Sequence, residues 1–80
     1  MIAVEVFSIV DCSLCEKAVT TLERIRTEIP FDLLVTRLEP AHPKYEEYRD
    51  HIPVVHLNGR YVCRHGVDPD LFRTLLKATL

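Results

Sequence analysis

The strongest local constraint on this chain is the dipeptide Asn58-Gly59, which stands between two runs rich in apolar residues, 53–57 and 60–63. A type I′ turn needs positive φ at both central residues, and Asn and Gly adopt that conformation at the least cost, so the segment predicts a β-hairpin. A two-residue turn also sets the register of its strands. The predicted pairs are Leu57 with Arg60, His56 with Tyr61, Val55 with Val62, and Val54 with Cys63.

The rest of the chain alternates between strand-like and helix-like patterns. Residues 2–9 and 31–38 are rich in β-branched residues and Leu, which predicts two strands, the first buried on both faces. Apolar residues recur every three or four positions over residues 13–28, which predicts an amphipathic helix that Pro30 ends. A short helix is predicted over residues 44–50, and Asp68 followed by Pro69 predicts the start of a final helix.

The predicted elements follow the order βαβαββα. A β–α–β unit followed by a hairpin and a helix indicates an α/β class, with a four-stranded mixed sheet and helices on both faces. Because 80 residues without a linker or repeat suffice for one small core, residues 1–80 are predicted to form a single domain. With helices covering both faces of the sheet, we expect a monomer.

Composition excludes several classes of function. The net charge is −2 and the basic residues are scattered, so no nucleic-acid partner is expected. No apolar run approaches the roughly 20 residues that span a bilayer, so no membrane partner is expected, and the N-terminus shows no signal-peptide pattern. Small secreted scaffolds usually carry an even, dispersed set of cysteines, whereas this chain has three, two of them close together. We therefore expect a cytoplasmic protein.

The close pair is Cys12-Ser13-Leu14-Cys15, at the junction of the first predicted strand and helix. A helix N-terminus favours an anion, and cysteines in such positions have pKa values lowered from about 8.5 to roughly 3.5–7.5. The thiolate is the nucleophile of disulfide exchange. We therefore assign Cys12 as the catalytic residue that attacks a disulfide and Cys15 as the one that resolves the mixed disulfide. The alternative is that both cysteines only pack as small hydrophobic residues.

Together with this motif, Phe7-Ser8, Ile52-Pro53-Val54 before the hairpin and Gly66 ahead of the last helix make the sequence resemble glutaredoxin-like proteins of the thioredoxin superfamily. The resemblance covers nearly the whole chain and implies a thioredoxin-like fold. Ile9 and Val10 stand where glutathione-dependent glutaredoxins usually carry a lysine. The sequence is therefore more similar to a small, poorly characterised glutaredoxin-like group than to a standard glutaredoxin.

The resemblance implies the rest of the site. Pro53 would be cis and lie beside Cys12, the Ile52 backbone would pair with the main chain of the substrate, and Asp68 would lie near the carboxylate of a bound glutathione. The implied activity is reduction of protein disulfides, or of mixed disulfides with a small thiol. No permanently bound cofactor is expected, and glutathione or a thioredoxin-type reductase would donate the electrons.

Two other functional classes remain open from the sequence. Cys12 and Cys15 with Cys63 and His65 offer four ligands that zinc accepts, and by resemblance an iron–sulfur cluster could be shared between two copies through Cys12. A non-catalytic interaction domain is the third class. Outside the pair, Cys63 is expected to be a buried small hydrophobic residue rather than a third redox thiol, and His56 a packed rather than a catalytic histidine.

Overall fold

The computed structural model describes residues 1–80 and contains the predicted elements in the predicted order. Its elements are β1 (Ala3–Ser8), α1 (Ser13–Arg26), β2 (Asp32–Arg37), α2 (Tyr45–Tyr48), β3 (Val54–Leu57), β4 (Arg60–Arg64) and α3 (Pro69–Thr79). None of the helices combines the length and the apolar character needed to cross a membrane.

The four strands form one mixed sheet in the order β2-β1-β3-β4. β1 pairs in parallel with β2 and antiparallel with β3, which pairs antiparallel with β4. This central position explains the nearly continuous apolar sequence of β1, in which Val4, Val6 and Phe7 are at most 4 % exposed. Glu5 interrupts that run, and its carboxylate accepts a hydrogen bond of 2.6 Å from the Thr36 hydroxyl on β2. The predicted α/β sheet is confirmed.

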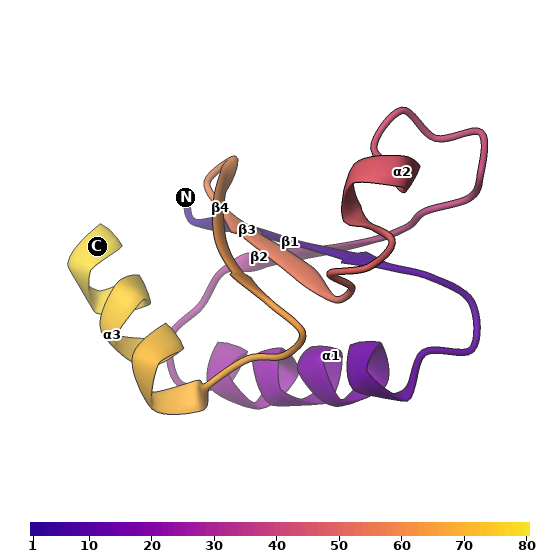
Figure 1. Cartoon of the computed structure of the whole chain (residues 1–80). Coiled ribbons are helices and arrows are strands. Elements are labelled where there is room, and N and C mark those ends of the chain that lie inside the picture. The colour runs from indigo at the N-terminus through magenta and orange to yellow at the C-terminus, as the bar shows by residue number, and fades with distance from the viewer.

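Helices lie on both faces of the sheet, as predicted. Figure 1 shows α1 and α3 on one face and α2 on the other. A larger core cluster joins the sheet to α1 and α3, and its members include Val4, Val6, Leu22, Ile25, Val55, Leu57, Phe72 and Leu76. A smaller cluster contains Phe7, Cys15, Leu38, Tyr48, Ile52 and Val54. The smaller cluster therefore supports the N-terminal end of α1, where the cysteine pair lies.

The helices predicted over residues 13–28 and 44–50 are shorter in the structure, because each one ends in a tight turn. After Arg26 the backbone N–H groups of Thr27 and Glu28 bond to carbonyls three residues back, so α1 ends before residue 28. The helix predicted over residues 44–50 is one turn, and the bond from His51 N–H to the Tyr48 carbonyl closes it in the same way.

The hairpin has the predicted turn, but the predicted register holds only next to it. Asn58 and Gly59 have φ values of 51° and 82°, and Leu57 pairs with Arg60 and His56 with Tyr61. A β-bulge follows, so that Val55 pairs with Cys63 and Val54 with Arg64. The extra residue is Val62. Strict alternation would put Val62 and Cys63 on opposite faces, whereas the bulge lets both pack against the larger core cluster.

Candidate active site

Cys12 is the N-cap residue of α1. The chain leaves β1 and turns at Asp11, whose φ of 55° is a left-handed conformation that Asp adopts more readily than most residues. Cys12 then has an extended backbone, and its Sγ accepts a hydrogen bond of 3.1 Å from the backbone N–H of Cys15. Sulfur thus occupies the position that a Ser or Asp oxygen takes at most helix N-termini, where the unpaired N–H groups favour negative charge.

Cys15 lies one helical turn beyond Cys12, and the two form a disulfide. Their Cα atoms are 5.2 Å apart, inside the range of about 4.4–6.8 Å that a disulfide requires. Cys12 is partly exposed, whereas Cys15 is 4 % exposed and belongs to the smaller core cluster. An external disulfide can therefore reach Cys12 and not Cys15.

The loop before β3 also contributes to the smaller cluster. Ile52 is 7 % exposed and packs in the same cluster as Cys15, Cys12 packs against that cluster, and the Ile52–Pro53 peptide bond is cis. The Pro53 carbonyl accepts a hydrogen bond of 2.8 Å from the backbone N–H of His65. The backbone N–H and C=O of Ile52 make no hydrogen bond within the chain. The structure thus brings Cys12, Cys15 and the Ile52-Pro53 segment together.

Asp68 lies elsewhere in the fold. It is the N-cap of α3, where its Oδ1 accepts hydrogen bonds from the N–H groups of Asp70 at 3.0 Å and Leu71 at 3.2 Å. Arg73 on the same helix pairs with Glu28, just after the C-terminal end of α1. Figure 1 accordingly shows the start of α3 at the end of α1 that is remote from Cys12. Contact between Asp68 and a bound glutathione stays a prediction.

The bulge in β4 places Cys63 and His56 on opposite faces of the sheet, contrary to the predicted register. Cys63 packs against the larger cluster with Val55, and burial raises the pKa of its thiol. His56 lies on the other face, where its Nε2 is 3.0 Å from the Tyr48 hydroxyl. Burial lowers the pKa of His56, although Glu5 on the paired strand acts in the opposite direction. Cys63 is only partly buried, and both side chains pack within the fold.

The structure does not assemble the zinc set that the sequence offers. No group of three or more His, Cys, Asp and Glu side chains lies close enough to hold a metal ion. Cys63 faces the larger cluster, and the ring of His65 lies 3.1 Å from the Asp50 carbonyl. Cys12, Cys15, Cys63 and His65 are therefore not gathered into one ligand set in this structure.

A groove of about 550 Å³ opens beside the cysteine pair. Val10, Val19 and Val35 contribute apolar surface, while Arg37 is its one basic residue. Val35 and Arg37 lie on β2. They reach the groove because parallel pairing with β1 sets Arg37 opposite Ser8, and the Leu38 N–H donates a hydrogen bond of 2.7 Å to the Ser8 carbonyl. Sequence reasoning missed these two residues, because no local pattern connects β2 to the cysteines.

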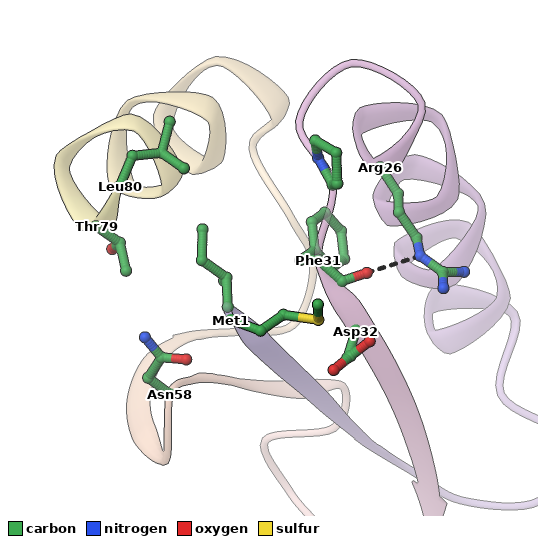
Figure 2. Close-up of a pocket in the computed structure, with 9 residues that line it drawn as sticks. Met1, Arg26, Phe31, Asp32, Asn58, Thr79 and Leu80 are labelled. Carbon is green, nitrogen blue, oxygen red and sulfur yellow. Dashed lines mark hydrogen bonds between the residues drawn. The ribbon is translucent and has the colours of Figure 1, made fainter.

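A larger cavity, of about 710 Å³, lies at the opposite end of the sheet (Figure 2). Met1, Phe31, Asn58 and Leu80 are among its lining residues, and Arg26 Nε donates a hydrogen bond of 2.8 Å to the Phe31 carbonyl there. Met1 and Leu80 are almost fully exposed, and no cysteine lies in this lining. The smaller groove is therefore the one that bears on the cysteine chemistry.

Comparison with known proteins agrees with this geometry. The Glutaredoxin-like domain family (DUF836) matches residues 3–77. The chain belongs to this family. The glutaredoxin-like domain thus extends over nearly the whole chain, as the sequence resemblance indicated. No curated protein matches the sequence.

Solved structures resemble the glutaredoxin-like domain in fold. The structural genomics target XcR50 from X. campestris matches with a TM-score of 0.77 and 22 % identity, over 94 % of this chain and 96 % of that one. Thioredoxin-2, described as a component of the protein secretion machinery of the malaria parasite, matches with a TM-score of 0.74 and 19 % identity, over 98 % and 82 %. Thioredoxin O2 from Arabidopsis thaliana matches with a TM-score of 0.58 and 13 % identity, over 98 % and 74 %. These likenesses confirm the thioredoxin-like fold.

Proposed function

We propose that this glutaredoxin-like domain is a thiol–disulfide oxidoreductase in which Cys12 and Cys15 carry two electrons to a substrate disulfide. The observation that carries the proposal is the position of Cys12 at the N-cap of α1, where its sulfur accepts the Cys15 N–H. That arrangement stabilises sulfur as the thiolate, which is both the nucleophile and the leaving group of disulfide exchange.

The reaction proceeds in two exchanges. The Cys12 thiolate attacks one sulfur of the substrate disulfide, a bond forms between Cys12 and that sulfur, and the other substrate sulfur leaves as a thiolate. Cys15 then loses its proton and attacks Cys12, which releases the second substrate thiolate and leaves the Cys12–Cys15 disulfide. The substrate has gained two electrons and the protein has lost two. The 5.2 Å separation of the Cα atoms allows the second step without movement of the backbone.

Burial supports the proposed order of attack. Cys12 is partly exposed and Cys15 is 4 % exposed, so the incoming disulfide meets Cys12 first. The free N–H and C=O of Ile52 support a role in holding the substrate main chain, because an extended segment alongside could satisfy both groups. The substrates we propose are protein disulfides and mixed disulfides with a small thiol.

The oxidised pair must be reduced again after each cycle. We propose glutathione or a thioredoxin-type reductase as the electron donor, since either supplies the two electrons and two protons that convert the disulfide to two thiols. The cysteine pair is itself the redox group.

The experiment that tests the proposal follows reduction of a peptide disulfide by wild-type protein and three single variants. We expect Cys12→Ser to lose activity completely. Cys15→Ser should attack once and stay linked to the substrate, which mass spectrometry of the unreduced protein would detect. Cys63→Ser is the matched control, because Cys63 packs against the larger cluster away from the pair, and it should retain wild-type activity.

A redox titration supplies the second measurement. Protein equilibrated with dithiol buffers of graded potential is alkylated and analysed by mass spectrometry. We expect one two-electron transition confined to Cys12 and Cys15. Full activity in Cys12→Ser, or a pair that stays reduced at every potential, would refute the proposed function.

A further inference from the structure

The groove beside the cysteine pair has charged groups of opposite sign on its two sides. Arg37, from β2, lies on the strand side, while Asp11 and Glu16 lie on the side formed by the start of α1. Arg37 is exposed and forms no ion pair, unlike Arg26, Arg49 and Arg73. The strand side of the groove therefore presents an uncompensated positive charge next to an apolar surface.

The groove is continuous with the reactive sulfur. Cys12 is part of its lining, so a substrate sulfur bonded to Cys12 must stand at its mouth. The chain on one side of that substrate cysteine then has to pass over the groove. β2 is an edge strand, paired only with β1, and Val35, which lines the groove, is 46 % exposed. This surface can receive an extended peptide segment.

We propose that this groove binds the segment that flanks the reactive cysteine of a protein substrate, and that Arg37 selects an acidic side chain in that segment. The inference rests on the proposed thiol–disulfide exchange and adds the kind of substrate. Arg37 acts as a specificity-determining residue: it attracts a carboxylate beside the cysteine under attack and takes no part in the exchange of sulfur bonds.

The expected effect is that of an exposed ion pair. Exposed pairs are worth roughly 0.2–1 kcal/mol, which corresponds to a preference of about 1.4- to 5-fold in rate for an acidic over a neutral neighbour. Asp11 and Glu16 repel an acidic neighbour and attract a basic one, but both carboxylates are present in wild type and in every Arg37 variant. The decisive quantity is therefore the change in preference when Arg37 is replaced.

The experiment uses peptides that each carry one cysteine, blocked as a mixed disulfide with 2-thiopyridine, a neutral leaving group whose release is followed by absorbance. The peptides differ only in the residues beside the cysteine, which are Glu, Gln or Lys. The second-order rate constant is measured with reduced wild-type protein and with the Arg37→Gln and Arg37→Glu variants. Arg60→Glu is the matched control, since it makes the same change of charge beside the hairpin turn, at the end of the sheet remote from Cys12.

We expect the ratio of the Glu-peptide rate to the Lys-peptide rate to fall about 3-fold in Arg37→Gln and about 10-fold in Arg37→Glu. The Gln-peptide rate should stay within about twofold of wild type in both variants, and about 0.5 M salt should reduce the differences. Arg60→Glu should keep the wild-type ratio.

Several outcomes would overturn the inference. An unchanged ratio in Arg37→Glu, or an equal change in Arg60→Glu, would exclude Arg37 as a selector. The mixed disulfide of glutathione with 2-thiopyridine is measured alongside, and a response confined to it would show a site for a small carboxylate instead of a protein segment. If wild-type protein reacts with none of the compounds, the proposed function itself fails. If it reacts with all peptides without the Arg37 effect, only the groove assignment fails.

Discussion

Replacing Asp68 with Ala should destabilise the domain without impairing its disulfide chemistry. In the structure Asp68 Oδ1 accepts two backbone hydrogen bonds, from Asp70 at 3.0 Å and Leu71 at 3.2 Å, and so satisfies two N–H groups at the start of α3. An N-cap of this kind contributes about 1 kcal/mol, and for a domain of this size each kcal/mol lowers the melting temperature by roughly 4–8 °C. Since Phe72 and Leu76 of α3 are buried in the larger cluster, loss of the cap weakens the whole domain.

The assay is thermal unfolding followed by circular dichroism, with Asp68→Asn as the control. Asn ranks with Asp as an N-cap residue, so this variant should keep most of the stability. The rate of exchange with a glutathione mixed disulfide is measured well below the unfolding temperature and should be unchanged in both variants, because Cys12 lies at the far end of α1. An unaltered melting temperature in Asp68→Ala would refute the capping argument. A large loss of rate in both variants would instead support the glutathione contact that the family resemblance implies.

Three further predictions concern stability. Leu22 is fully buried in the larger cluster, so Leu22→Ala should cost about 3 kcal/mol in urea unfolding, and Leu22→Met much less. Gly59 has a φ of 82° and open space where a Cβ would lie, so Gly59→Ala should lower the free energy of unfolding by about 1 kcal/mol through the backbone alone. Gly66→Ala is the control and should not destabilise the domain, because Gly66 also has free space but no positive φ. A hydrogen bond from Arg73 lowers the pKa of Glu28. The stability that ionised Glu28 contributes is therefore present above the pKa of the unfolded state, and it is lost as the pH falls through the pKa of the folded state. The free energies of unfolding of wild type and Glu28→Gln should converge in acid.

Local sequence signals located the start of each element and the cysteine pair. The Asn58-Gly59 turn depends on the φ preferences of two adjacent residues, and Asp68-Pro69 on the chemistry of one helix cap, so neither needs the rest of the fold. The change from strand-like to helix-like periodicity at Cys12 placed the sulfur at a helix N-terminus for the same reason. The order of the elements follows from these signals, and that order in turn predicts the four-stranded mixed sheet.

Interactions between distant segments decided the rest. The bulge at Val62, beyond the His56–Tyr61 pair, depends on the core. It allows both Val62 and Cys63 to pack against the larger cluster, and this packing outweighs the loss of regular pairing between β3 and β4. Sequence periodicity could not show this, since it describes one strand at a time.

The surroundings of the cysteine pair also depend on contacts between segments that are distant in the sequence. Arg37 and Val35 reach the groove only because β2 pairs in parallel with β1, and Asp68 lies away from Cys12 because α3 docks at the other end of α1. By itself the sequence determined that Cys12 and Cys15 share one helical turn, a property of backbone geometry over four residues. Only the tertiary structure decided which side chains surround the pair, because those residues come from strands brought together by burial of the core.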